Sequence, residues 1–324
     1  MPLSFHPSHP RRTVNAMRLL LAAPEDVRPA LTHALYRAYW VDNDDLSEPR
    51  TLATIAREHG IDPDVVKDPA IKQVLFDAVD EAVARGAFGV PTLFVGDDMW
   101  WGVDRLPLVR EALGAPRPLA PERVKTGASL VMFHDFSSPF SYLASTQVER
   151  IARETGANLT FAPFLLGALF KEIGTPLVPM DAMNPAKRAY YESDLKHMAG
   201  WWGVPFRWSS HFPLRTVAAL RVAIQEPATT TAIYRAAWAE DRDIADAVVL
   251  RGVLDDAGFD GAALLEGTQD RDVKDTLRAN TAWARRAGAC GAPTFLVDGE
   301  VLFWGEDRLD MVADALRGWR PAVG

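Results

Sequence analysis

The sequence predicts an α/β protein in which a truncated copy of one structural unit precedes a complete copy of the same unit. Two observations support the complete unit: residues 129–164 have the pattern strand, helix, strand, and residues 294–304 have the pattern of a β-hairpin. The third observation is an internal sequence repeat. Trp101-Gly-Val-Asp-Arg-Leu106 returns as Trp304-Gly-Glu-Asp-Arg-Leu309, and other segments return in the same order.

The complete unit is expected to open with a βαβ motif. The short apolar run at residues 130–133 suits a buried strand. Pro139 fits the first turn of a helix, where its missing N–H costs nothing, and Gly156 is placed to end that helix. Residues 159–164 form the next strand, so the two strands should be parallel with a right-handed crossover.

A long helical stretch and a hairpin complete this unit. Residues 167–285 have a helical pattern rich in Trp, Tyr and Ala. Residues 294–297 and 301–304 then flank Asp298-Gly299, a strong hairpin turn signal. A final helix carries Leu309, Val312, Ala313 and Leu316 on one face. This order of elements is that of a thioredoxin fold with a large helical insertion.

The first unit repeats only the later parts of this pattern. Residues 10–18 match residues 213–221, and residues 34–40 match residues 232–238. Nothing in the first unit corresponds to residues 129–200, so it lacks the opening βαβ. We therefore predict a partial unit at residues 1–114, a proline-rich linker at 115–127 and a complete domain at 128–324.

Composition excludes several classes of function. The net charge of −8 argues against nucleic acid as a partner, and no apolar run is long enough for a membrane span. The N-terminus has no signal-peptide pattern, so we expect a cytoplasmic protein. Cys290 is the single cysteine, which rules out a CxxC pair, and the seven histidines form no metal-binding pattern.

Two short segments predict the chemistry. Ser138-Pro-Phe-Ser141 follows the first strand where a thioredoxin fold usually carries CxxC, and Ala292-Pro293 precedes a later strand. Serine cannot exchange disulfides, but its hydroxyl can donate a hydrogen bond to a thiolate that a ligand brings, and a helix N-terminus favours that anion. Glutathione is the obvious thiol. The alternative is that Ser138 is an ordinary helix N-cap. We predict cis bonds at Ala292-Pro293 and at Val90-Pro91.

These motifs give residues 129–320 a resemblance to 2-hydroxychromene-2-carboxylate isomerases and the related kappa-class glutathione transferases. It is carried by residues 135–143, 164–171, 185–188 with Asp194-Leu195, 291–294 and 304–309, in that order. The first unit is similar to the last half of the same family.

The resemblance implies a role for each matching residue. Ser138 would hold the glutathione thiolate, and Asn184 and Trp202 would line the pocket of an aromatic substrate. Further glutathione contacts would come from Lys171, Ala292, Pro293, Trp304, Gly305, Asp307 and Arg308. Ordinary readings stay open: Lys171 as a solvated helix lysine, Asp307 as a favourable charge in a first helical turn, and Trp202 as core.

The implied function is a glutathione-dependent isomerase that converts 2-hydroxychromene-2-carboxylate to trans-o-hydroxybenzylidenepyruvate in aromatic catabolism. Thiolate addition would open the ring, a single bond would rotate, and glutathione would leave unchanged. The alternatives are a kappa-like transferase or peroxidase acting on another electrophile, and a non-catalytic pseudo-enzyme. Because such relatives are typically homodimers, we expect an intramolecular pseudo-dimer or a homodimer.

Overall fold

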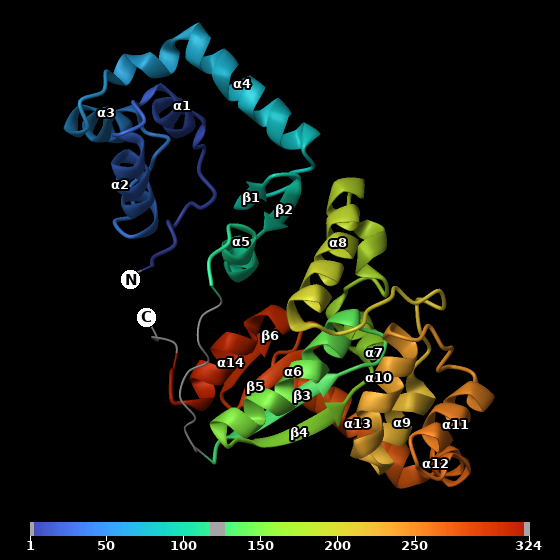
Figure 1. Ribbon diagram of the computed structural model, residues 1–324. Helices are drawn as coiled ribbons and strands as arrows, with labels where there is room; N and C mark the ends of the chain where they lie inside the picture. Colours follow the sequence, from blue (N-terminus) through green and yellow to red (C-terminus); the bar gives the residue numbers. More distant parts are fainter. Residues whose placement is uncertain (1–2, 117–126, 321–324) are drawn as a thin grey trace. The chain divides into compact units, whose positions relative to one another are not determined.

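The computed structural model describes residues 3–116 and 127–320 (Figure 1). The chain forms two compact units, Met1–Phe88 and Gly89–Gly324. The boundary that the repeat predicts, at residue 114, therefore lies inside the second unit, so the end of the predicted truncated copy belongs with the predicted complete copy. Most of the predicted linker, residues 117–126, lies outside the described residues.

The first unit is helical in its described part. Its elements are α1 (Val14–Ala22), α2 (Arg28–Trp40), α3 (Pro49–Glu58), the 3-10 helix η1 (Pro63–Lys67) and α4 (Pro69–Ala84). Leu19, Leu31, Leu35 and Ala56 lie at the centre of one small core between α1, α2 and α3. The longest of these helices, α4, contributes no buried residue to it.

The second unit holds all the strands of the described chain. Its elements up to residue 202 are β1 (Thr92–Val95), β2 (Asp98–Trp101), η2 (Val103–Arg105), α5 (Leu106–Ala112), β3 (Ser129–His134), α6 (Pro139–Thr155), β4 (Asn158–Pro163), α7 (Leu166–Ile173), η3 (Pro179–Ala182) and α8 (Pro185–Trp202). The remainder are α9 (Val217–Gln225), η4 (Pro227–Thr229), α10 (Thr230–Trp238), α11 (Ala247–Asp256), α12 (Gly261–Gly267), α13 (Arg271–Arg286), β5 (Thr294–Val297), β6 (Val301–Trp304), η5 (Glu306–Arg308) and α14 (Leu309–Leu316).

The strands form two sheets. The larger has the order β4-β3-β5-β6, in which β3 and β4 are parallel and the other pairs are antiparallel. The smaller sheet is the antiparallel pair β1-β2. The predicted parallel βαβ motif and the hairpin at residues 294–304 are thus confirmed, with α6 ending at Gly156 in a left-handed conformation (φ 68°).

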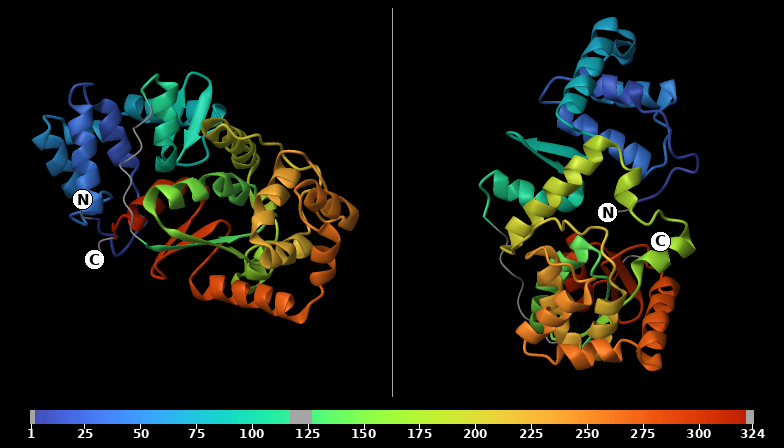
Figure 2. Two further views of the ribbon diagram at one scale, coloured as in Figure 1. Left: turned by 60° about the horizontal axis from the view of Figure 1, so that its bottom comes forward. Right: turned by 90° about the vertical axis from the view of Figure 1, so that its right-hand side faces the viewer.

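Helices cover both faces of the four-stranded sheet (Figure 2). Leu130 and Met132 point to one face, where they pack with α6 and α14. Phe133 and Leu296 pack on the other face with Ala284 of α13 and Leu169 of α7. Successive side chains of a strand point to opposite faces, which is why an uninterrupted apolar run suits this doubly covered sheet.

The last elements of the truncated copy share a core with the complete copy. Trp100 of β2 and Leu108 of α5 belong to the same buried cluster as Leu195 and Met198 of α8. That cluster continues through α9, α10 and α11 and contains the fully buried Trp238. The helical insertion therefore builds a second core beside the sheet.

These elements confirm the thioredoxin-like fold with a helical insertion. The two predicted cis bonds, Ala292-Pro293 and Val90-Pro91, are also confirmed. The structure adds a second matched pair of cis bonds that the sequence did not predict, at His9-Pro10 and Phe212-Pro213. In the part of the chain that the structure describes, no helix is both long enough and apolar enough to cross a membrane.

Candidate functional site

The candidate site begins at the turn between β3 and α6. The Asp135 carboxylate accepts hydrogen bonds from the Ser137 backbone N–H (3.0 Å), the Thr216 hydroxyl (2.6 Å) and the Leu166 backbone N–H (2.9 Å). Burial raises the pKa of Asp135 above its ordinary value, and these donors oppose that rise. Asp135 thereby ties the turn to the start of α7 and fixes the direction in which the chain enters α6.

Ser138 is the N-cap of α6 and also faces the cis-proline loop. Its Oγ accepts a hydrogen bond from the Ser141 backbone N–H (3.1 Å) and donates one to the Ala292 carbonyl oxygen (2.8 Å). The side chain is 5% exposed. Ser138 is therefore the N-cap of α6 and lies opposite Ala292-Pro293, while its role toward a thiolate stays a prediction.

The hairpin holds the cis-proline loop from the other side. The Gly305 backbone N–H donates to the Pro293 carbonyl (3.1 Å). The Trp304 indole lies against Gly291, where a Cβ atom would come within 2.5 Å of the indole Nε1. A Cβ at this position would force the indole to shift, so the glycine allows Trp304 to lie close to the loop.

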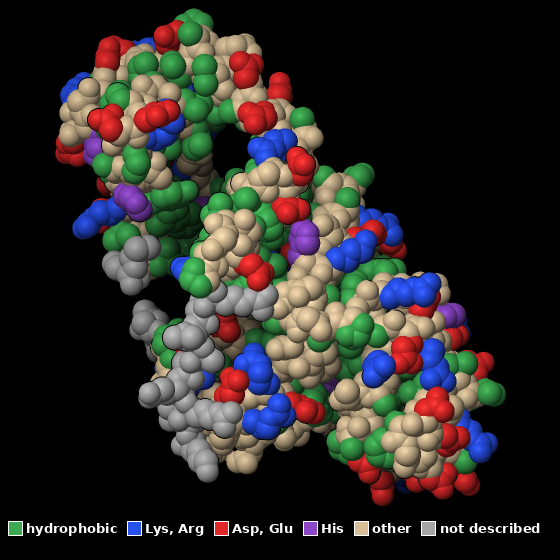
Figure 3. Space-filling model, in the orientation of Figure 1, with side chains coloured by type: hydrophobic (Ala, Val, Ile, Leu, Met, Phe, Trp, Pro, Cys, Tyr) green, Lys and Arg blue, Asp and Glu red, His purple; other side chains and the backbone are tan. Residues whose placement is uncertain are grey.

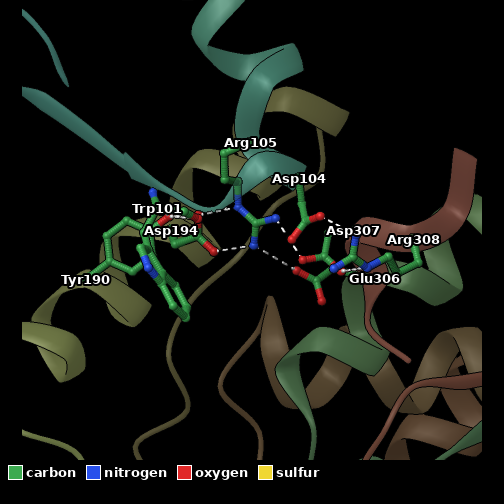
Figure 4. A network of polar contacts seen from close by, with 8 residues as sticks. All are labelled: Trp101, Asp104, Arg105, Tyr190, Asp194, Glu306, Asp307 and Arg308. Atoms are coloured by element: carbon green, nitrogen blue, oxygen red, sulfur yellow. Dashed lines mark hydrogen bonds and ion pairs between the residues drawn. The ribbon is translucent and has the colours of Figure 1, made fainter. Parts of the chain in front are cut away.

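A buried network of ion pairs lies next to this hairpin (Figure 4). The Arg105 guanidinium donates two parallel hydrogen bonds to the Asp194 carboxylate, both 2.7 Å long, and a third to Asp307 (2.9 Å). Its Nη2 atom also lies 3.6 Å from Oε1 of Glu306. Arg105 comes from the truncated copy, whereas the three carboxylates belong to the complete copy. Although burial opposes its charge, the carboxylates hold the pKa of Arg105 above its ordinary value.

The network contains a reciprocal exchange. Arg308 pairs with Asp104, and Arg105 pairs with Asp307. In the sequence echo, Asp104-Arg105 corresponds to Asp307-Arg308, so each copy's arginine binds the other copy's aspartate. Self-complementary contacts of this kind are the signature of a two-fold interface.

Glu306 is the exceptional member of the network. It is 3% exposed, and its Oε1 atom has no hydrogen-bond partner within the described residues. Burial, and then the nearby Asp307 carboxylate, raise the pKa of Glu306 to about 8. Burial also raises the pKa of Asp104.

The structure brings most of the predicted site residues together. Ser138, Ala292, Pro293 and Gly305 are linked by hydrogen bonds, with Trp304 beside them and Asp307 and Arg308 following in η5. Three others take no part in those bonds. Lys171 is exposed in the last turn of α7, Asn184 is the exposed N-cap of α8, and Trp202 is half-buried against two core clusters.

Sequence reasoning missed several residues of the network. Asp104 and Arg105 were noted only because their motif repeats the second one, and no role was predicted for Tyr190 or Glu306. Tyr190 links the same copies, since its hydroxyl donates to Asp194 (3.0 Å) and accepts from the Trp101 backbone N–H (2.9 Å). The sequence feature that could have identified them is the repeat, because a repeated Asp-Arg pair can form a reciprocal contact.

The described part of the chain contains no group of three or more His, Cys, Asp or Glu side chains arranged to hold a metal ion. The arrangement at Ser138 suits an anionic ligand atom instead. A hydroxyl proton at the N-terminus of the 17-residue helix α6 lies opposite the cis-proline loop.

Comparison with known proteins defines the class. The DSBA-like thioredoxin domain family matches residues 1–114 and 129–317, so the chain belongs to that family. A 2-hydroxychromene-2-carboxylate isomerase from Sphingobium xenophagum is 31% identical over 194 residues, which cover 57% of this chain and 95% of the isomerase. Glutathione S-transferase kappa 1 from Rattus norvegicus is 28% identical over 203 residues, which cover 57% of this chain and 88% of the transferase.

A solved structure supports the same fold. That of a selenomethionine-labelled 2-hydroxychromene-2-carboxylate isomerase superposes with a TM-score of 0.53 at 22% identity, covering 58% of this chain and 94% of the isomerase. The resemblance stated from the motifs is thereby confirmed. The family match to residues 1–114 supports the truncated copy, which stays a prediction.

Proposed function

We propose that the chain is a glutathione-dependent enzyme and that its reaction is the isomerisation of 2-hydroxychromene-2-carboxylate. The observation that carries this proposal is Ser138, whose hydroxyl lies between the N-terminus of α6 and the cis-proline loop. The two relatives described above, an isomerase and a glutathione transferase, support it.

The residues present fit a thiolate ligand. The Ser138 hydroxyl has a single proton, which now goes to the Ala292 carbonyl. Rotation about the C–O bond turns that proton toward a sulfur atom, while Oγ continues to accept from the Ser141 N–H. The Ala292 carbonyl is then free to accept from a backbone N–H of the bound peptide.

Glutathione would supply the nucleophilic thiolate and be regenerated, and the protein would bind and orient it. Ser138 and the N-terminus of α6 would stabilise the anion. Ala292 and Pro293 would position the cysteinyl part, and Trp304, Gly305, Asp307 and Arg308 the γ-glutamyl part. Lys171, Asn184 and Trp202 are proposed to reach the aromatic substrate or glutathione from the edge of the site.

The reciprocal pairs Asp104–Arg308 and Arg105–Asp307 support the intramolecular pseudo-dimer over the homodimer. In this proposal residues 89–112 take the place that a second subunit would occupy. Residues from both copies then stand beside one complete site.

Ser138→Ala tests the proposed function. Losing a hydrogen bond to an anion should lower kcat/KM by about one to two decades, equivalent to roughly 1.5–3 kcal/mol. Ser145→Ala is the matched control, since it removes the same group two turns further along α6, where the hydroxyl donates to the Tyr142 carbonyl. We would assay both variants with the chromene substrate, with and without glutathione.

The product separates the candidate activities. Glutathione-dependent isomerisation supports the proposal, whereas a stable conjugate indicates the kappa-like transferase or peroxidase. No turnover by the wild-type chain indicates a pseudo-enzyme. Unchanged kcat/KM in Ser138→Ala would falsify the assignment of Ser138, because the thiolate would then be held by other groups.

A further inference from the structure

Helix α4 of the first unit matches helix α13 of the second unit, and both helices contain 16 residues. When the two are aligned end to end, Leu75 matches Leu277 and Ala82 matches Ala284. Leu277 and Ala284 are buried in α13. Because these positions carry the same residues, the other sides of the two helices can be compared position by position.

Apolar residues of α4 replace two arginines of α13. Phe76 stands where α13 has Arg278, and Val83 stands where α13 has Arg285. Both arginines are exposed, so the fold places these two positions at the surface. The missing βαβ motif therefore does not account for the replacements. Its loss uncovers a core face, but it gives no reason for apolar residues at positions that are exposed even in the complete copy.

A third position, between these two, has lost a polar group. In α13 the Thr281 hydroxyl accepts a hydrogen bond from the Leu165 backbone N–H (3.0 Å), and α4 has Val79 at the matching place. Phe76, Val79 and Val83 follow one another at helical spacing, so they lie on one side of α4, and we call them the α4 stripe. They are 51%, 49% and 64% exposed. An exposed apolar surface of this kind marks a place of contact with another molecule.

The charges of α4 favour a second copy of the same helix as the partner. Lys72 lies on the side of the α4 stripe, since its Nζ atom is 5.6 Å from the centre of the Phe76 ring. Asp80 and Glu81 lie in the second half of the helix. In an antiparallel pair, the end that carries Lys72 lies beside the acidic end of the other copy. A parallel pair would bring like charges together, and it would also align the two helix dipoles.

The spacing along this side of α4 also suits a helix pair. Lys72, Phe76, Val79 and Val83 are separated by four, three and four residues, which is the spacing of a coiled-coil seam. A two-fold interface uses the same patch on both copies, so the patch must be complementary to itself. In an antiparallel pair centred between Phe76 and Val79, each Phe76 packs against Val79 of the other copy, and Lys72 lies at either end.

We propose that α4 joins two copies of this chain as an antiparallel helix pair along the α4 stripe. The contact buries the stripe of each copy and places Lys72 beside the acidic residues of the other. It is separate from the reciprocal ion pairs of Arg105 and Arg308, which form within one chain. It also uses no residue of the site at Ser138, so each copy keeps its own site.

Sedimentation velocity of the full-length chain over a range of concentrations tests the contact, and we expect a reversible dimer. Phe76→Arg gives α4 the residue that α13 has at that place, so the helix should fold normally. It should raise the Kd of the dimer at least about tenfold, because it puts a charge at the centre of the contact. Ala84→Arg is the matched control, since it adds the same charge at an exposed position on another side of α4, and it should leave the Kd unaltered.

Disulfide trapping tests the direction of the pair. Cys290, the single cysteine, is first removed by Cys290→Ser. Phe76→Cys and Val79→Cys are then made in separate chains that carry tags of different size. In a mixture of the two chains, the antiparallel pair predicts that the disulfide between positions 76 and 79 forms faster than either homodimer.

Three results would overturn the proposal. The first is a chain that stays monomeric at every concentration, and if its α4 amides are then protected from hydrogen exchange, the second unit of the same chain covers the stripe. The second is a dimer that Phe76→Arg weakens no more than Ala84→Arg does. The third is faster formation of the homodimer disulfides, which would exclude the antiparallel pair.

Discussion

The predicted truncated copy (residues 1–114) and the predicted complete copy (residues 128–324) share an order of elements, and their described residues differ in burial. Their common elements run in the same order, pairing α1 with α9, α2 with α10, α3 with α11, α4 with α13, β1 with β5, β2 with β6 and α5 with α14. The Ser4 N–H donates to the Trp40 carbonyl at 2.7 Å, and the Arg207 N–H donates to the Trp238 carbonyl at the same distance. Local sequence therefore reproduces local structure in both copies.

The same tyrosine has opposite surroundings in the two copies. Tyr36 and Tyr234 occupy matching places in the second repeated segment, but Tyr36 is 62% exposed and Tyr234 is fully buried. Rings of His134, Phe136 and Tyr142 lie around Tyr234, and all three belong to the βαβ motif. The truncated copy has no counterpart of that motif.

The matching helices α4 and α13 show the same difference in burial. In α13, Leu277 and Ala284 are buried, and the helix packs on β4, α7 and α9. The described residues of α4 include none that is buried, and hydrophobic side chains are visible along this helix in the upper part of Figure 3. The exposed ones are Val74, Phe76, Val79 and Val83. An apolar pattern thus predicts a helix face, while the partner decides whether that face is covered.

Removing the truncated copy should give the largest effect. We expect deletion of residues 1–116 to uncover the core around Leu195 and Met198, where Trp100, Leu108 and Val109 now pack. Burying three such side chains contributes roughly 5–8 kcal/mol. The shortened chain should unfold at lower urea, bind a hydrophobic dye, and aggregate or dimerise.

A second deletion, of residues 1–88, shows which part matters, because it keeps β1, β2 and α5. Equal losses in the two deletions would place the effect in the first unit. A monomer with unchanged Tm and activity after deletion of residues 1–116 would show that the truncated copy has no structural role.

The sequence predicted the elements well, since their signals are local. Pro139 and Gly156 bound α6, and Asp298-Gly299 forms the hairpin turn with both residues at positive φ (52° and 72°). The uninterrupted apolar run of β3 also indicates a strand whose two faces are both covered. The fold could therefore be predicted from spacing and turn chemistry.

The site was predicted only in part, because its remaining members depend on contacts between distant segments. The motifs that end at Arg105 and Arg308 differ at one position only, yet Arg105 is buried among three carboxylates and Arg308 is partly exposed. Most of this difference therefore arises from the elements around each arginine. The hydrogen bond from Ser138 to Ala292 likewise joins residues 154 positions apart.

Replacing each of the two matched arginines measures that difference directly. Arg105→Met should lower the free energy of unfolding by about 3–5 kcal/mol, because it leaves buried carboxylates without their cation. Arg308→Met should cost only about 0–1 kcal/mol, since that side chain is 37% exposed in its ion pair with Asp104. Urea unfolding of the two variants checks the comparison, and equal losses would contradict the asymmetry.

The pH dependence of stability tests the effect of Glu306, whose counterpart in the first motif is Val103. The folded-state pKa of Glu306, about 8, lies above its ordinary value of 4.5. Between these values the folded chain holds a proton that the unfolded chain has lost, so this residue costs more stability as the pH rises. The free energy of unfolding of Glu306→Gln, relative to that of the wild type, should therefore rise by at most about 1.4 kcal/mol per pH unit between pH 5 and 8.

Urea unfolding at pH 5, 6.5 and 8 measures this gain. Arg105, Asp194 and Asp307 surround residue 306 in both proteins, so the difference between the two isolates its titration. Parallel stability curves would show that Glu306 keeps an ordinary pKa in the folded chain.

The smallest expected effect comes from the paired tyrosines. The Tyr234 hydroxyl donates to the Asp135 carbonyl (3.2 Å) and pairs with Nδ1 of His134 (3.0 Å). Burial lowers the pKa of His134 to about 3, so the imidazole is neutral, and Tyr234→Phe removes the partner of its Nδ1 atom. Tyr234→Phe should therefore lower the free energy of unfolding by about 1–3 kcal/mol.

Tyr36→Phe, in an exposed ring, should stay within about 0.5 kcal/mol of the wild type. Equal costs in urea unfolding would mean that Tyr36 is also covered, and the missing βαβ motif would then no longer explain the contrast between the copies.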